Sequence, residues 1–114
     1  MKKYRIGIIG LGVMGMAYLN EIINSSRWEA YSIYDINREK LEKVKKVLPG
    51  VKICESPQEI FSDPFVDVVG LFIYANIRPE YIRQALAAGK HILAEKPLAE
   101  NVDEEDRLVQ EIEK

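Results

Sequence analysis

An apolar run that leads directly into a glycine-rich turn constrains this chain most. Residues 6–15 read Ile-Gly-Ile-Ile-Gly-Leu-Gly-Val-Met-Gly, which contains the spacing G-x-G-x-x-G. Between a strand and a helix, this spacing predicts a site for the pyrophosphate of a dinucleotide. Gly10 permits a tight turn, Gly12 leaves room for the pyrophosphate, and Gly15 lets the helix pack on the strand. The helix N-terminus would face the phosphates, and the same predicted site includes Leu11, Val13 and Met14.

Asp35 is the second informative residue. It follows a predicted strand and lies twenty residues beyond Gly15, where a carboxylate reaches the adenosine ribose of a bound dinucleotide. Such a carboxylate accepts hydrogen bonds from the hydroxyls of NAD and repels the 2′-phosphate of NADP. Arg38 could instead pair with a 2′-phosphate. We therefore predict NAD in preference to NADP, with Ile36 and Arg38 in the same segment of the site.

Each of these residues also has a simpler interpretation. Asp35 could cap the following helix, and Arg38 could be an ordinary solvent-facing residue in the first turn of that helix. A glycine-rich turn can also bind nothing. The strand before the glycine turn and the acid twenty residues after Gly15 favour the dinucleotide interpretation.

Strand-like and helix-like segments alternate along the chain. Predicted strands are Tyr4–Ile9, Trp28–Tyr34, Val51–Cys54, Val66–Tyr74 and His91–Ala94. Predicted helices are Val13–Asn24, one from an Asn37 cap to Leu48, a short one after Ser56, one from Pro79 to Gly89 and one after Asn101. This order predicts an α/β fold with a doubly wound parallel sheet, the Rossmann fold, in strand order 3-2-1-4-5. We expect a single three-layer domain over residues 1–114.

Local patterns make this prediction specific. Ser56 and Glu59 have the spacing of a capping box. The first helix is expected to bury Leu19, Ile22 and Ile23, and the helix from Pro79 to bury Ile82, Ala85 and Leu86. The nearly continuous apolar run from Val66 predicts a central strand that is buried on both faces.

Composition excludes several classes of function. A formal net charge of −2 and a pI near 5.5 give no electrostatic basis for binding nucleic acid or an anionic membrane. With one cysteine, Cys54, and one histidine, His91, neither an internal disulfide nor a zinc site is expected. We therefore expect a cytoplasmic, reducing setting. No apolar run reaches the length of a membrane span.

Several short motifs in this order and spacing resemble the Gfo/Idh/MocA family of NAD(P)-dependent oxidoreductases. They are the glycine turn, Asp35, Asp67-Val68-Val69, Ala88-Gly89-Lys90-His91 and Glu95-Lys96-Pro97, and the resemblance covers essentially the whole chain. It implies that residues 10–15 bind pyrophosphate and that Asp35 binds the ribose. It also implies that Lys96, beside the nicotinamide, positions the substrate and assists proton transfer from its hydroxyl. Pro97 would fix the direction of this lysine, and Glu95 would line the same site.

One segment departs from the family pattern. After the fourth strand the family usually carries T-P-N-x-x-H on the nicotinamide side, whereas this chain reads Ile-Tyr-Ala-Asn-Ile-Arg over residues 73–78. Detailed contacts therefore transfer poorly. Tyr74 could stack on the cofactor or simply fill the pocket. The predicted site residues in this segment are Ile73, Tyr74, Ala75 and Arg78.

The resemblance implies the dinucleotide-binding domain of an oxidoreductase that moves hydride between a nicotinamide cofactor and a sugar, cyclitol or related polyol. Family enzymes continue into a second domain with the substrate pocket, which we expect to be absent here. The chain would then bind cofactor with little or no turnover. The alternative is a non-catalytic nucleotide-binding or redox-sensing module for NAD(H) or CoA. The surface that a second domain covers is expected to be apolar, which favours a homo-oligomer.

Overall fold

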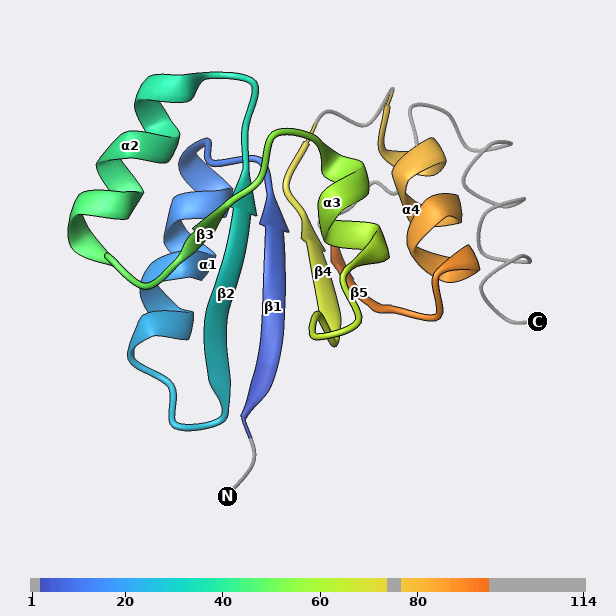
Figure 1. The fold of residues 1–114 in the computed structure, drawn as a ribbon, viewed down its shortest axis with the longest axis horizontal. Coiled ribbons are helices and arrows are strands. Elements are labelled where there is room, and N and C mark those ends of the chain that lie inside the picture. Colours follow the sequence, from blue (N-terminus) through green and yellow to red (C-terminus); the bar gives the residue numbers. More distant parts are fainter. Residues whose placement is uncertain (1–2, 74–76, 95–114) are drawn as a thin grey trace.

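The protein was analysed as a computed structural model, which describes residues 3–73 and 77–94. Five parallel strands form one sheet in the order β3-β2-β1-β4-β5 (Figure 1). The strands are β1 (Tyr4–Ile9), β2 (Trp28–Tyr34), β3 (Lys52–Ile53), β4 (Val68–Leu71) and β5 (His91–Ala94). The helices are α1 (Val13–Ile23), α2 (Arg38–Val47), α3 (Pro57–Ser62) and α4 (Arg78–Ala87). The predicted α/β fold and strand order are confirmed.

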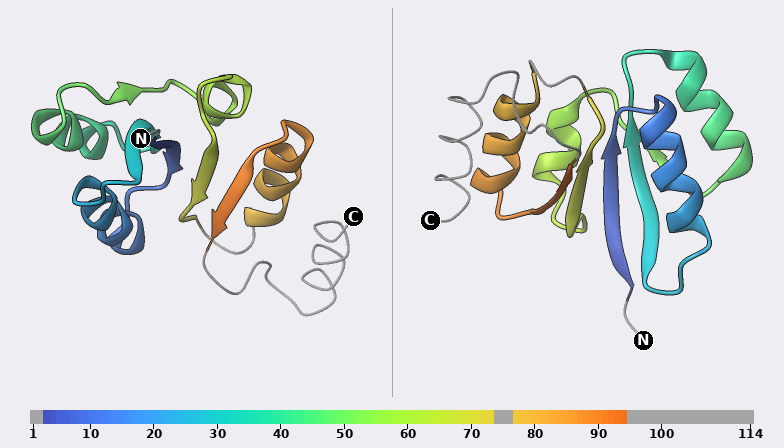
Figure 2. Two further views of the ribbon diagram at one scale, coloured as in Figure 1. Left: turned by 90° about the horizontal axis from the view of Figure 1, so that it is seen from below. Right: turned by 180° about the vertical axis from the view of Figure 1, so that it is seen from behind.

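The helices cover both faces of the sheet, as the end-on view in Figure 2 shows. One hydrophobic cluster joins α1 and α2 to the sheet and contains Ile6, Ile8, Leu19, Ile33, Leu41 and Val44. A second cluster joins α3 and α4 to the opposite face and contains Ile9, Cys54, Ile60, Val69, Leu71 and Ile82. β1 and β4 contribute to both clusters, because successive side chains of a strand point to opposite faces. The predicted three layers are therefore present.

β4 is buried on both faces, as predicted, but it is shorter than the apolar run. All four of its residues are buried. Val66 is also buried, yet its N–H donates to the Asp63 carbonyl at 3.1 Å as part of the preceding turn. The apolar run therefore predicted the burial of this segment correctly but overestimated the length of the strand.

Two predicted helix ends are confirmed. The Asn37 side chain accepts a hydrogen bond from the Glu39 N–H at 3.0 Å and caps α2. Gly89 has φ +73° and ends α4, with its own N–H on the Leu86 carbonyl and the Lys90 N–H on the Ala85 carbonyl, both at 3.0 Å. This pair of bonds is the Schellman motif.

The prediction of a capping box at Ser56 and Glu59 is wrong. Ser56 makes no side-chain cap hydrogen bond, although it does precede α3. The Glu59 carboxylate instead accepts the N–H of Glu55 at 2.6 Å, one residue earlier than the motif requires. The carboxylate still satisfies a backbone donor beside the helix start.

Two of the expected core positions are less buried than the pattern suggested. Ile23 is 39% exposed at the end of α1, whereas Leu19 and Ile22 are buried. Leu86 is only partly buried against the second cluster, and Ile82 and Ala85 are buried as predicted. None of the described helices combines the length and apolar character needed to cross a membrane.

Candidate functional site

Gly10 begins the turn at the carboxyl end of β1, between the ends of β2 and β4. Its N–H donates to the Tyr34 carbonyl at 2.9 Å, and its φ is +99°, in the region that favours glycine. A Cβ at this position would lie 2.3 Å from the carbonyl oxygen of Phe72. Both the turn and the adjacent strand therefore require glycine here.

Gly15 lets α1 approach the glycine turn. A Cβ on Gly15 would lie 2.1 Å from the carbonyl oxygen of Gly10, and Gly15 is buried in the first turn of α1. This contact agrees with the close helix–strand packing that the sequence predicts.

Gly12 differs from these two glycines because none of the described residues requires a glycine there. Its φ of −75° and ψ of −163° are open to any residue. In the part of the chain that the structure describes, no heavy atom would lie within 4 Å of a Cβ on Gly12. Space beside this backbone is therefore free, as it must be if a ligand is to approach the turn closely.

The N-terminus of α1 is electrostatically suited to an anion. Gly12 is the N-cap and supplies no side-chain acceptor, and the first turn contains no acidic residue. The first N–H groups of a helix have no intrahelical partner and carry partial positive charge. Val13 is 88% exposed and Met14 is 47% exposed, so solvent reaches this end of the helix. A phosphate group fits this environment.

Asp35 lies directly after β2 and binds the glycine turn. Its Oδ2 accepts the N–H of Leu11 at 2.7 Å, and its Oδ1 accepts the N–H of Asn37 at 2.8 Å. The cap of α2 is Asn37, which rules out Asp35 as the capping residue. Each carboxylate oxygen can accept more than one hydrogen bond, so this partly buried group keeps acceptor capacity. The Leu11 side chain is 2% exposed and belongs to the core.

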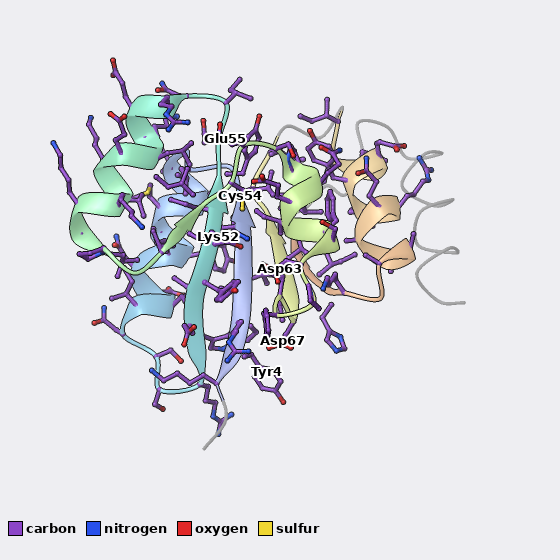
Figure 3. The ribbon with its side chains drawn as sticks, viewed as in Figure 1. Tyr4, Lys52, Cys54, Glu55, Asp63 and Asp67 are labelled. Atoms are coloured by element: carbon purple, nitrogen blue, oxygen red, sulfur yellow. The ribbon has the colours of Figure 1, made fainter. Side chains whose placement is uncertain are left out.

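Residues after Asp35 extend this edge of the sheet. The Ile36 side chain is 91% exposed. Arg38 Nη1 donates to both carboxylate oxygens of Glu55, at 3.2 and 3.3 Å. Sequence reasoning missed Glu55, which Figure 3 shows at the same end of the sheet as the glycine turn. The pairing of Ile33 with Ile53 explains the position of Glu55. Asp35 and Glu55 each lie two residues after this pair, so both emerge at the carboxyl edge of the sheet.

The predicted nicotinamide side is described only in part. Arg78 is 7% exposed at the start of α4, and its Nη2 donates to the Ile73 carbonyl. Ile73 is partly buried against the second cluster. Arg78 therefore holds the backbone that follows β4. The other predicted residues here lie outside the described residues: Tyr74, Ala75, Glu95, Lys96 and Pro97.

Charged groups elsewhere in the described ranges are structural or dispersed. Lys90 Nζ donates to the carbonyls of Asp63 and Val66 at 2.6 and 2.8 Å and so ties β5 to the turn before β4. Within residues 3–73 and 77–94, no three metal-binding side chains gather into a cation site. Among the described polar groups, those around the glycine turn are the best suited to bind a ligand.

Comparisons with known proteins agree with this geometry. A family model described as "Oxidoreductase family, NAD-binding Rossmann fold" matches residues 4–114. The chain is 33% identical over 110 residues to a myo-inositol 2-dehydrogenase of Thermotoga maritima, covering 96% of this chain and 33% of the relative. It is 26% identical over 104 residues to a scyllo-inositol 2-dehydrogenase (NADP(+)) of Bacillus subtilis, with 91% and 28% covered. The chain thus spans about a third of the length of these relatives.

Solved structures show the same fold. The scyllo-inositol dehydrogenase of Lactobacillus casei, solved with bound NAD(H) and scyllo-inositol, matches with a TM-score of 0.89 and 25% identity. The match covers 98% of this chain and 33% of that chain. The similarity therefore includes the whole sheet and its helices.

Proposed function

This chain belongs to the Gfo/Idh/MocA family of oxidoreductases, and we propose that its glycine turn binds the pyrophosphate of a nicotinamide dinucleotide. One observation carries the proposal. Gly12 is the only one of the three motif glycines at which a Cβ would meet no atom of residues 3–73 and 77–94. A glycine that the fold does not require is explained by a ligand that approaches its backbone.

The remaining contacts follow from the site. The N–H groups at the start of α1 would bind the pyrophosphate, and the free acceptor capacity of Asp35 would receive the adenosine ribose hydroxyls. Ile36, exposed beside Asp35, would supply apolar contact area to the adenine. A carboxylate at this position favours NAD over NADP. The bound nicotinamide ring would supply the hydride acceptor or donor.

The substrate class comes from the relatives. Those named above are inositol dehydrogenases, and we propose that the whole protein acts on a secondary alcohol of a cyclitol, sugar or related polyol. Lys96 would position the substrate hydroxyl and help to remove its proton. An amine that is partly removed from water has a lowered pKa, which suits it to this proton transfer.

Residues 1–114, assayed alone, would bind the cofactor and turn over little or no substrate. Catalysis requires the reacting carbon to be held against the nicotinamide in a narrow range of geometries. These residues match a family model described as an NAD-binding Rossmann fold and span about a third of the length of the relatives. Dinucleotide affinity, rather than turnover, is therefore the property to measure first.

The test is a calorimetric titration of the chain with NADH, NADPH and CoA, repeated on Gly12→Ala. We expect saturable NADH binding that falls about tenfold or more in Gly12→Ala, because a methyl group would occupy the space of the pyrophosphate. The melting temperature of Gly12→Ala should stay close to that of the wild type, since the added Cβ meets no atom among the described residues. Unchanged NADH affinity in Gly12→Ala would contradict the proposal. Preferential CoA binding would favour the non-catalytic module instead.

A further inference from the structure

Glu55 holds the arginine that is placed to recognise a 2′-phosphate. Arg38 Nη1 lies 3.2 Å from Oε1 and 3.3 Å from Oε2 of Glu55. Arg38 is the first residue of α2 and follows Asp35 by three positions. A guanidinium is the side chain best suited to bind a phosphate. In this structure its charge is directed to a carboxylate of the protein.

The sheet register brings the two acids to the same edge of neighbouring strands. Ile33 pairs with Ile53, and the Cys54 N–H continues the ladder by donating to the Ile33 carbonyl at 2.9 Å. Neighbouring strands lie about 4.8 Å apart, and Asp35 and Glu55 each follow the last residues of their strands at the carboxyl edge of the sheet. The Glu55 backbone is itself anchored, because its N–H donates to the Glu59 carboxylate at 2.6 Å.

The Arg38–Glu55 pair is exposed and therefore adjustable. The Arg38 side chain is 60% exposed and that of Glu55 is 71% exposed. An exposed ion pair of this kind is weak, so a modest change at Glu55 is enough to free the arginine. With Glu55 present, a 2′-phosphate has to compete for Arg38 and also meets a second carboxylate at the same sheet edge as Asp35.

We propose that Glu55 sets the preference for NAD over NADP by occupying Arg38. The inference rests on the proposed function, because it presumes a dinucleotide whose adenosine ribose lies at Asp35. Glu55 is a positioning residue: it acts on the cofactor through Arg38. The sequence alone left open that Arg38 binds the 2′-phosphate of NADP. If Arg38 is paired with Glu55 instead, the prediction of NAD still holds.

The experiment compares NADH and NADPH affinities of the purified chain in four proteins: wild type, Glu55→Gln, Arg38→Gln and the double variant. In Glu55→Gln we expect NADPH to bind about two- to fivefold more tightly, the upper part of the range that release of one exposed ion pair supplies, with NADH affinity changed less than about twofold. Arg38→Gln alone should change NADPH binding little. In the double variant most of the gain should be lost.

A matched control removes a carboxylate charge at an exposed position of α2. Glu42 is exposed, and Glu42→Gln should leave the ratio of NADPH to NADH affinity unchanged. The gain in Glu55→Gln should also shrink as salt is raised, because it depends on exposed charges. A general loss of stability would move neither the ratio nor its salt dependence.

Three results would count against the idea, and each has a separate meaning. If Glu55→Gln changes NADPH affinity no more than Glu42→Gln does, the inference is overturned while the proposed function stands. If the gain persists in full in the double variant, Glu55 acts by its charge alone and the role of Arg38 is refuted. If the wild type binds neither NADH nor NADPH, the proposed function itself fails.

Discussion

The Leu11 N–H donates a 2.7 Å hydrogen bond to Asp35 Oδ2. The residue that we propose to bind the ribose therefore also holds the glycine turn to the end of β2. Its other oxygen accepts the Asn37 N–H at 2.8 Å, which orients the start of α2. Fold and candidate site thus share one carboxylate.

Substituting Asp35 should lower both the stability of the fold and the affinity for NADH. Asp35→Ala removes two acceptors of backbone N–H groups, and we expect it to lower the free energy of unfolding by about 1–3 kcal/mol. NADH affinity should fall about tenfold or more with the loss of the ribose acceptor. Urea unfolding and calorimetric titration measure the two effects separately.

Asp35→Asn is the matched variant for this prediction. It keeps the size of the side chain and one acceptor oxygen, so it should retain more stability than Asp35→Ala. An Asp35→Ala protein as stable as the wild type would show that the hydrogen bonds to Leu11 and Asn37 contribute nothing to folding.

The three motif glycines should separate into structural and ligand-related positions. Gly15→Ala places a Cβ 2.1 Å from the Gly10 carbonyl oxygen, so α1 must move away from the turn. We expect a loss of about 1–3 kcal/mol in unfolding free energy, as for other overpacked buried sites. Thermal unfolding followed by circular dichroism tests this, with Gly12→Ala as the control that should melt like the wild type. Equal melting of all three proteins would contradict the geometry.

Sequence reasoning succeeded where a single residue type answers a local geometric need. The turn at Gly10, the Asn37 cap and the left-handed end of α4 at Gly89 all appear where predicted. Strand order followed from the alternation of elements, because parallel strands require crossover connections. Each of these signals lies within a few neighbouring residues of the sequence.

The features that sequence reasoning missed depend on distant or competing partners. Glu55 is seventeen residues from Arg38, and nothing in either local pattern indicates that they meet. Glu59 matches the capping box in spacing but binds the N–H of Glu55, because the approach of the chain to α3 decides which donor it reaches. Arg78 stands where the family resemblance led us to expect a histidine, and only the fold shows that it is buried against the backbone after β4.

Cys54 should make stability depend on pH above neutrality. Its side chain is 1% exposed, and burial raises the pKa of the thiol from 9.0 to about 11. The folded state therefore keeps the proton that the unfolded state loses, so this contribution is complete below pH 9 and disappears as the pH rises to about 11. With about 1.4 kcal/mol per pKa unit, the loss in unfolding free energy reaches up to about 3 kcal/mol.

Urea unfolding between pH 8 and 11 measures this loss. Cys54→Ala, although less stable at pH 8, should show a shallower decline, and parallel profiles for the two proteins would refute the assignment to this thiol.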